Sequence, residues 1–324
     1  MKKVLVTGGA GTIGLQVIRF LLSEGKYDVT VLELKSRHTY RRLKKYRKRI
    51  SIVYGDVKDS ALVDALIKEN EFVIHLAGVL PPFANLKEEY SRILNYNGTE
   101  NIVRAIKDYN PKCHLFYCSS TSVYGKVEGK EVVNVKTVGK ISDFDYYSKY
   151  TLECEELIQK SLNNYTIFRT SYVLCDVKSE TVIYTVPKDS LLEAISSEDA
   201  GYAFVAAIDN RKVLNKKIFN LTGGTGYTLL FRDYLVKVLD CYGLSLRYIT
   251  NNLFADKDYN CHLYSDSEKL NDILNFRSKN IDLYYDTLEI YKHNIFRLIP
   301  RLLAKPFVWK LKMEKNKKWQ KKED

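Results

Sequence analysis

Glycines near the start of the chain have a spacing that suits phosphate binding. Gly8, Gly11 and Gly14 recur every third residue, directly after the apolar run 4–6. Glycines let a backbone turn sharply and approach a pyrophosphate, whose charge then lies against the free N–H groups of the following helix. A purely structural turn would use the same residue types, so the order strand, turn, helix carries the prediction of a dinucleotide site. The cofactor contacts predicted in this turn are Gly8, Gly11, Thr12, Ile13 and Gly14.

An acidic residue follows at the distance that a dinucleotide site requires. Glu33 ends the next apolar run, nineteen residues after Gly14. A carboxylate at this point accepts hydrogen bonds from the adenosine ribose hydroxyls and repels a 2′-phosphate, which favours NAD over NADP. Lys35 and Arg37 follow directly, however, and arginine is the residue that accommodates that phosphate. NAD is therefore the predicted cofactor, and NADP is the alternative.

Two later segments also contain residues that could take part in chemistry, 119–122 with hydroxyl groups and 145–149 with a lysine. Four consecutive hydroxyl residues, 119–122, follow the apolar run 114–118. At the end of a strand such residues usually form a solvated turn. The segment 145–149, Asp-Tyr-Tyr-Ser-Lys, enters a helical pattern that continues past Glu153. The chemistry of both segments depends on which elements hold them.

Alternating strands and helices are predicted to position these residues. Short apolar runs without two-residue alternation indicate strands that are buried on both faces, and the segments between them have helical periodicity. A parallel sheet covered by helices on both sides is the fold that this pattern predicts. The predicted strands are 3–6, 27–32, 50–54, 72–76, 114–118 and 166–169. Parallel sheets bind ligands at the carboxyl ends of their strands, where the glycine turn, Glu33, Asp56 and Ala77-Gly78 all fall.

The second half of the chain reads as a smaller lobe followed by a basic tail. We predict a strand at 181–186, a helix from Ser197 with Ser196 or Ser197 as its N-cap, and a strand at 217–221. The glycine-rich segment 223–226 lacks a following acid and is predicted to be a loop. The expected division is a dinucleotide-binding domain over 1–170, a substrate lobe over 171–296 that is interleaved with the end of the sheet, and a tail over 297–324.

Composition indicates a globular protein rather than a membrane or disulfide-stabilised one. The chain has 324 residues, of which 45% are hydrophobic and 28% charged. No run approaches the roughly 18 apolar residues that a spanning helix needs. The six cysteines are scattered without metal-ligand spacing, which favours free thiols in a reducing cytoplasm and no bound metal. A cytoplasmic location is expected.

The net charge of +12 is concentrated in two segments. Residues 35–49 contain nine lysines and arginines and no acid, and residues 297–324 contain ten against three acids. A solvated helix face is the usual meaning of the first segment. The second segment, the tail, combines its charge with Trp, Phe and Leu. Two interpretations remain: a helix that packs on the rest of the protein, or a segment that contacts an anionic inner membrane surface or another polyanion. No specific nucleic-acid motif accompanies the charge.

Several of these motifs together resemble the extended short-chain dehydrogenase/reductase family, in particular its NAD-dependent sugar-nucleotide epimerases and dehydratases. They occur in the order that the family shows. The matching segments are 7–14, 55–57 (Gly-Asp-Val), 75–78 (His-Leu-Ala-Gly), 97–99 (Asn-Gly-Thr), 119–125 (Ser-Ser-Thr-Ser-Val-Tyr-Gly), 148–153 (Ser-Lys-x-x-x-Glu) and the C-terminal segment 264–276. The resemblance implies a Rossmann-type doubly wound parallel sheet with a small α/β C-terminal lobe, a homodimer and a nucleotide-sugar substrate.

The resemblance also implies roles for individual residues. Ser120 would hydrogen-bond the reacting sugar oxygen. Lys149 would hold the nicotinamide ribose and lower the pKa of a catalytic tyrosine four residues before it. The residues that the resemblance assigns to the remainder of the cofactor are Asp56, Val57, Ala77, Gly78 and Asn97.

Position 145 departs from that pattern, because it holds aspartate where the family has its catalytic tyrosine. Tyr146 could replace the missing base, although a regular helix rotates it about 100° from position 145. Asp145 could itself be the base, although a carboxylate with a pKa of about 4 is poorly matched to a sugar hydroxyl. The third alternative is a protein that binds the cofactor without catalysis and serves as a sensor or partner-binding module. Thr121 and Ser122 also replace the acidic pair of family dehydratases, which disfavours dehydration.

Overall fold

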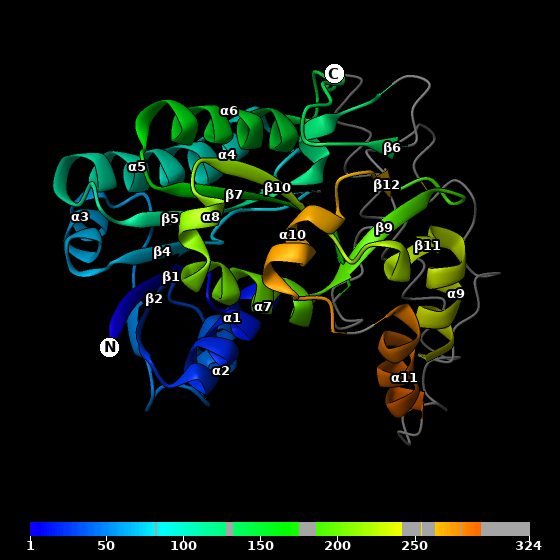
Figure 1. Cartoon of the computed structure of the whole chain (residues 1–324), viewed down its shortest axis with the longest axis horizontal. Coiled ribbons are helices and arrows are strands. Elements are labelled where there is room, and N and C mark those ends of the chain that lie inside the picture. The colour runs from blue at the N-terminus through cyan, green and yellow to red at the C-terminus, as the bar shows by residue number, and fades with distance from the viewer. Residues whose placement is uncertain are drawn as a thin grey trace.

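Seven parallel strands form the central sheet of the structure, a computed structural model that describes residues 1–81, 83–127, 132–174, 186–241, 254, 263–278 and 280–292 (Figure 1). The strands are β1 (Lys2–Thr7), β2 (Tyr27–Glu33), β3 (Ser51–Tyr54), β4 (Phe72–His75), β5 (His114–Ser120), β7 (Tyr165–Thr170) and β10 (Lys217–Leu221). Their spatial order is β10-β7-β5-β4-β1-β2-β3, so the direction of winding reverses between β1 and β4. The predicted doubly wound parallel sheet is confirmed, and the reversal marks the crevice where such sheets bind ligands.

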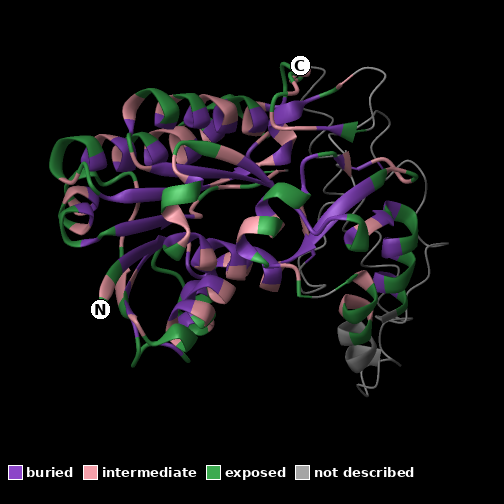
Figure 2. Cartoon of the chain, in the orientation of Figure 1, coloured by how far each residue is buried: buried purple, intermediate pink, exposed green. Residues whose placement is uncertain are grey.

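Helices cover both faces of the sheet. Figure 1 shows α5 (Asn97–Tyr109) and α6 (Tyr146–Ser161) on one side, with α1 (Thr12–Glu24) and α7 (Ser197–Asp209) on the other. Side chains alternate between these layers: Val4 and Val6 pack in the cluster with α1 and α7, whereas Leu5 packs in the cluster with α5, α6 and α3 (Ser60–Glu69). The inner strands β1, β4, β5 and β7 are therefore buried on both faces (Figure 2), as their continuous apolar runs predict, whereas the edge strand β3 contains no fully buried residue.

The second lobe is built on a three-stranded sheet and a two-stranded one. The three strands are β8 (Tyr172–Leu174), β9 (Leu191–Ser196) and β11 (Thr228–Leu230), and β6 (Val132–Val133) pairs with β12 (Leu263–Tyr264). The helices α9 (Phe231–Cys241) and α11 (Ile281–Lys292) pack in the lobe, whereas α10 (Glu268–Leu274) packs with Leu270 and Leu274 in the cluster that contains α1 and α7. The Ser196 hydroxyl accepts the Asp199 N–H at 2.9 Å, which confirms the predicted N-cap of α7. The predicted strand 181–186 falls mostly outside the described residues, and the tail 297–324 lies wholly outside them.

A long helical stretch follows β4 and is interrupted by a π-helical turn. The sequence predicts helix from about 86 to 109, and the structure has α4 (Glu88–Ser91), the π-helix η1 (Arg92–Tyr96) and then α5. Asn95 lies in the π-helical turn and is buried. Its side-chain oxygen accepts the Val79 N–H at 2.7 Å, and its amide nitrogen donates to the Val79 carbonyl at 3.1 Å. The turn therefore fixes the loop that follows β4.

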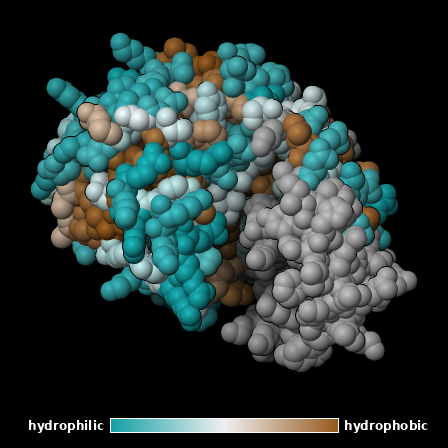
Figure 3. All heavy atoms as spheres, turned by 90° about the horizontal axis from the view of Figure 1, so that it is seen from below, coloured by the Kyte–Doolittle hydropathy of each residue, from teal (hydrophilic) through white to brown (hydrophobic). Residues whose placement is uncertain are grey.

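The basic segment 35–49 forms an exposed surface on one face of the molecule. Its short helix α2 (Arg37–Leu43) is capped by Ser36, whose hydroxyl accepts the Thr39 N–H at 3.1 Å. Thr39, Leu43 and Tyr46 turn inward, which leaves most of the charged side chains outside. Figure 3, seen from below, shows hydrophilic residues over the part of the molecule that carries α2. Within the part of the chain that the structure describes, no helix is long and apolar enough to cross a membrane.

His75, the last residue of β4, links three elements beneath the predicted cofactor crevice. It is 1% exposed, and its ring nitrogens contact the Thr7 hydroxyl at 2.6 Å and the Thr99 hydroxyl at 3.0 Å. The Thr7 hydroxyl in turn accepts the Ala77 N–H at 3.2 Å. Burial lowers the pKa of His75 from 6.5 to about 4 because a charged imidazolium would lose its hydration.

The lowered pKa of His75 predicts a loss of stability in acid. The unfolded chain binds this proton near pH 6.5 and the folded chain only near pH 4, so the free energy of unfolding falls as the pH drops through that window. We expect His75 to account for about 3 kcal/mol of that fall. Urea unfolding of the wild type and His75→Asn at several pH values measures it. A difference between the two proteins that does not change with pH would contradict the assignment.

Candidate active site

The glycine turn is too tightly packed for a side chain at Gly8 or Gly14. Gly8 has a φ of 72°, and a Cβ there would lie 2.7 Å from the Ala77 nitrogen. A Cβ on Gly14 would lie 2.4 Å from the Gly8 carbonyl oxygen. The turn is closed by a hydrogen bond from the Gly11 N–H to that same oxygen at 2.9 Å. Strand β1, helix α1 and the loop after β4 therefore meet within contact distance, which requires glycine at these positions.

The first turn of α1 is left open to an anion. Gly11 is its N-cap and supplies no side-chain acceptor, and the first turn contains no acidic residue. The N–H groups at Thr12 and Ile13 therefore have no capping side chain, and the helix dipole favours negative charge there. This arrangement fits a pyrophosphate.

Glu33 lies against the glycine turn from the end of β2. One of its carboxylate oxygens accepts the Ala10 N–H at 2.8 Å, and the other accepts the Leu34 N–H at 3.1 Å. Each oxygen has a second lone pair, so the carboxylate can still accept hydrogen bonds from ribose hydroxyls. The predicted acid thus stands beside the predicted phosphate site.

The loops after β3 and β4 are held by side chains from the long helical stretch. Asn101 donates from its amide to the Val57 carbonyl at 3.1 Å, and the Val57 side chain stands where a Cβ on Gly98 would collide. Asp56 accepts the Lys58 N–H at 3.0 Å. Ala77 and Gly78 are fixed through Thr7 and Asn95, as described above, and Asn97 begins α5. Asn95 and Asn101 are supporting residues that the sequence motifs did not single out.

Ser120 ends β5 at the same edge of the sheet. Its hydroxyl accepts the Ser122 N–H at 3.1 Å, so the hydroxyl run begins with a capped 3₁₀ turn, η2 (Thr121–Tyr124). Ser120 pairs with Thr170 of β7. The next residue, Ser171, has a buried hydroxyl with no hydrogen-bond partner among the described residues. The unpartnered Ser171 hydroxyl could bind a substrate, and the glycine turn could bind a dinucleotide, so both features fit the proposed ligands.

A buried ion pair supports this end of β5. Glu155 of α6 is fully buried and accepts from Arg169 of β7 at 2.7 Å and from the Ser119 hydroxyl. The Arg169 guanidinium also lies over the Tyr124 ring and donates to the Val135 carbonyl at 3.1 Å. The network therefore ties β5, α6 and β7 together directly behind Ser120.

Asp145 acts as the N-cap of α6. Its Oδ1 accepts the Ser148 N–H at 3.2 Å and the Asn85 amide at 3.0 Å, and its Oδ2 accepts the Ser148 hydroxyl at 2.6 Å. The helix accordingly begins one residue later than the sequence pattern suggests, at Tyr146. The Asp145 carboxylate is thus engaged in holding the helix start.

Tyr146 and Lys149 lie toward the surface of α6. Tyr146 is half-buried, and within the described chain no hydrogen bond joins it to Ser120. Lys149 has a side chain that is 48% exposed and forms an ion pair with Glu88 of α4 at 2.7 Å. The Tyr150 hydroxyl donates to the same Glu88 oxygen at 3.0 Å. The structure therefore brings Ser120 and the cofactor loops to one edge, with the Lys149 ammonium held at its margin.

Tyr147 is a residue that the sequence reasoning missed. Its N–H donates to the Asn85 side-chain oxygen at 2.8 Å, and burial raises the pKa of its phenol. The helical period could have identified it, because Tyr147 stands four, seven and eleven residues before Thr151, Cys154 and Ile158, which lie on the buried face of α6. Tyr147 is itself half-buried, as Tyr146 is.

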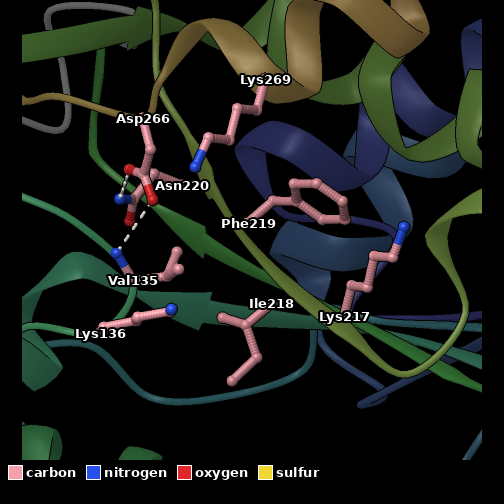
Figure 4. Close-up of a pocket in the computed structure, with 8 residues that line it drawn as sticks. All are labelled: Val135, Lys136, Lys217, Ile218, Phe219, Asn220, Asp266 and Lys269. Atoms are coloured by element: carbon pink, nitrogen blue, oxygen red, sulfur yellow. Dashed lines mark hydrogen bonds between the residues drawn. The ribbon is translucent and has the colours of Figure 1, made fainter.

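A cavity of about 370 Å³ lies apart from these residues, along the outer edge of β10. Figure 4 shows Lys136, Lys217 and Lys269 around it. Asp266 accepts the Val135 N–H at 3.0 Å and the Asn220 amide at 2.7 Å at one end of it. Strand β10 is four places from β1 in the sheet, so this cavity is not the dinucleotide crevice.

Comparison with known proteins identifies one family. A model described as the NAD dependent epimerase/dehydratase family matches residues 4–197. The dTDP-glucose 4,6-dehydratase of Mycolicibacterium smegmatis is 28% identical over 172 residues, which are 52% of this chain and 51% of that protein. The GDP-6-deoxy-D-talose 4-dehydrogenase of Aggregatibacter actinomycetemcomitans is 23% identical over 91% of this chain and 99% of its own. The match to the first of these spans about half of that relative's length.

Solved structures share the fold. UDP-glucuronic acid 4-epimerase from Bacillus cereus, in complex with UDP-glucuronic acid and NAD, superposes with a TM-score of 0.72. The alignment covers 89% of this chain and 99% of the epimerase at 18% identity. At this identity the likeness concerns the arrangement of the elements, and it includes the lobe that follows the central sheet.

Proposed function

Because the chain belongs to the NAD-dependent epimerase/dehydratase family, we propose that it binds NAD across the carboxyl ends of β1 to β5 and acts on a nucleotide sugar by hydride transfer. The observation that supports this most strongly is the convergence of the glycine turn, Glu33 and Ser120 at one edge of the sheet. When bound, NAD accepts a hydride from a sugar carbon and can return it. Ser120 would hold the oxygen of that carbon.

The division of labour between the two parts of the chain follows from the same proposal. Residues 1–170 would bind the dinucleotide, and the lobe over 171–296, apart from α7, β10 and α10, which return to the central sheet, would cover the sugar. The relatives named above are named for dTDP-glucose, GDP-6-deoxy-D-talose and UDP-glucuronic acid. Their shared chemistry is a hexose on a nucleoside diphosphate, and that is the substrate class we propose.

Glu33 supports NAD over NADP in this proposal. Its carboxylate lies against the glycine turn, where it would face the ribose 2′-hydroxyl and repel a 2′-phosphate. Lys35 and Arg37 are exposed and follow Glu33 directly, so Glu33→Ala would leave their charge uncompensated. We expect wild type to bind NAD more tightly than NADP, and the variant to narrow or reverse that preference. Titration of both cofactors by calorimetry measures it.

A turnover experiment tests the reaction itself. The protein is incubated with NAD or NADP and with hexoses linked to UDP, dTDP, GDP and CDP, and the products are separated by chromatography and mass spectrometry. We expect one nucleotide class to be converted and Ser120→Ala to lower that rate about 100-fold, since a hydrogen-bond donor to the reacting oxygen is lost. NAD binding without conversion of any sugar would contradict the proposed reaction and leave cofactor binding standing.

A further inference from the structure

The basic segment 35–49 carries positive charge that no ion pair compensates. Eight of its nine lysines and arginines are exposed, and the ninth, Arg42, is half-buried. None of the nine forms an ion pair with an acid within the described residues, whereas Arg19 on α1 pairs with Glu198 at 2.7 Å. Solvated helix faces commonly mix charges of both signs, so a run of one sign points to an anionic partner.

Inward-facing residues hold this segment in one orientation. Leu43, Tyr46 and Ile50 are at most 9% exposed and pack in the cluster that contains α1 and α7. The Tyr46 N–H donates to the Leu43 carbonyl at 2.9 Å, and the Arg49 N–H donates to the Tyr46 carbonyl at 2.7 Å. Hydrogen-bonded turns therefore continue where α2 ends. Because the apolar residues are fixed inside, the cations between them are held on the outer surface of the protein.

Two large apolar side chains are exposed beside these cations. Leu34 is 57% exposed, and Tyr40 is 48% exposed. The Thr39 hydroxyl donates to the Leu34 carbonyl at 2.7 Å, and the Tyr40 N–H donates to the Ser36 carbonyl at 3.0 Å, so a closed turn joins the two residues. A single exposed leucine is common on a protein surface. Leucine and an aromatic residue fixed beside a run of cations, however, form the combination that binds membrane surfaces.

The composition of this surface distinguishes among anionic partners. An anionic lipid bilayer offers charge to the lysines and arginines and an interfacial layer to Leu34 and Tyr40. A nucleic acid would use the same charge, and Tyr40 could stack on a base, but Leu34 would gain no partner and the sequence has no nucleic-acid motif. A single phosphate group would meet only a few of nine cations that are spread over fifteen residues. A lipid surface therefore accounts for most of what is exposed.

We propose that the basic segment 35–49, together with Leu34 and Tyr40, is a docking surface for an anionic lipid bilayer. The cations approach the lipid headgroups, and the two apolar side chains enter the interfacial layer. Each lysine or arginine close to such a surface raises the affinity about fivefold. The attraction falls off within a Debye length, which is about 8 Å at physiological salt. Docking requires neither bound NAD nor turnover, so it stands apart from the proposed reaction.

Vesicle sedimentation with the full-length protein tests the docking. One set of vesicles is pure phosphatidylcholine, and the other is an equal mixture of phosphatidylcholine and phosphatidylglycerol. We expect binding to the mixed vesicles, little binding to the neutral ones, and a steep loss of affinity as salt is added, because exposed charges are screened. Equal binding to both sets of vesicles would overturn the proposal.

A triple variant locates the surface on the chain. Lys44→Gln, Arg47→Gln and Lys48→Gln together remove three positive charges from exposed positions. We expect the affinity for the mixed vesicles to fall at least about tenfold. NAD affinity and the melting temperature should stay as in wild type, since the three residues lie outside the glycine turn and the core. The tail 297–324 is present in both proteins, so unchanged vesicle binding by the variant would refute the proposal.

A second triple variant controls for the loss of charge itself. Lys136→Gln, Lys217→Gln and Lys269→Gln remove the same three charges from exposed positions around the cavity beside β10. We expect the affinity for the mixed vesicles to change by less than about threefold, because these residues lie away from the segment 35–49. Equal losses for the two triple variants would show that net charge, and not this surface, governs binding.

Leu34→Ala separates a lipid bilayer from other polyanions. We expect vesicle binding to weaken about threefold or more, because less apolar surface enters the interfacial layer. Val213→Ala is the control, since Val213 is 53% exposed outside the segment, and it should bind as wild type does. Unchanged binding by Leu34→Ala would reject insertion into lipid. Tighter binding to a single-stranded RNA oligonucleotide than to the mixed vesicles, at the same salt concentration, would overturn the choice of a lipid partner.

Discussion

Glu155→Ala is expected to lower the free energy of unfolding by about 3–5 kcal/mol, because it leaves a buried guanidinium without its partner. Glu155 is fully buried, and Arg169 is only 6% exposed. The carboxylate accepts from Arg169 at both its Nε, 3.0 Å away, and its Nη2, 2.7 Å away. Domains are stable by about 5–15 kcal/mol, so the loss is a large share of the total. The midpoint of urea unfolding measures it.

The neighbouring residue provides the control. Glu156 is exposed and pairs with Lys160 one helical turn later, at 3.0 Å. Exposed pairs of this kind contribute about 0.5 kcal/mol or less, so Glu156→Ala should leave the unfolding midpoint almost unchanged. Equal losses for the two variants would mean that the helix, and not the buried ion pair, is the source of the effect. Glu155→Ala should also displace Ser119, and with it Ser120.

Gly14→Ala is expected to weaken NAD binding at least about tenfold, which corresponds to about 1.4 kcal/mol. The added methyl group would meet the Gly8 carbonyl oxygen at 2.4 Å and the Gly9 Cα at 2.7 Å, and backbone atoms cannot rotate away as a flexible side chain can. Helix α1 would have to move outward from the turn. We expect an additional loss of stability of about 1–3 kcal/mol from the overpacking. Calorimetric titration with NAD checks the first effect and urea unfolding the second.

Gly25 distinguishes these effects from the general cost of replacing glycine. It ends α1 with a φ of 67°, and a Cβ there would meet nothing within 4 Å. Gly25→Ala should therefore destabilise the protein by about 1–2 kcal/mol through backbone strain, with unchanged affinity for NAD. If Gly25→Ala weakened NAD binding as much as Gly14→Ala does, a steric role for the glycine turn would be wrong.

Local sequence signals were sufficient for the central sheet and the cofactor crevice. Apolar β-branched runs predicted the strands of the sheet. The glycine spacing and Glu33 predicted that the ends of β1 and β2 lie together, because parallel strands end at the same edge. The N-cap of α7 could also be predicted from the sequence, because Ser196 is a short polar residue directly before a helical pattern whose first turn contains two acidic residues. Each of these features depends on neighbours within a few positions in the chain.

Features that depend on distant contacts could not be read in this way. Asn85 contacts residues 60 and 62 positions later, so nothing near it indicates a role at the start of α6. The sequence suggests Asp145 as a possible base, because the resemblance places the family's catalytic tyrosine at this position. In the structure, its carboxylate accepts hydrogen bonds from Ser148 and Asn85 and caps α6. The same limit applied to Tyr147, because its N–H is bound by the side chain of Asn85, which lies 62 positions earlier in the chain.

The conformation of the loop after β4 depends on the number of residues in the π-helical turn, and not only on their identity. Residues 92–96 hold one more residue per turn than an α-helix would, and Asn95 lies in that turn with both ends of its amide on Val79. Removing one residue there would restore regular helical bonding and take Asn95 out of the π-helical turn that directs its amide at Val79. The helix would become more regular while Ala77 and Gly78 lost their support. Insertions and deletions in this segment therefore act on the crevice, whereas most substitutions on its outer face should not.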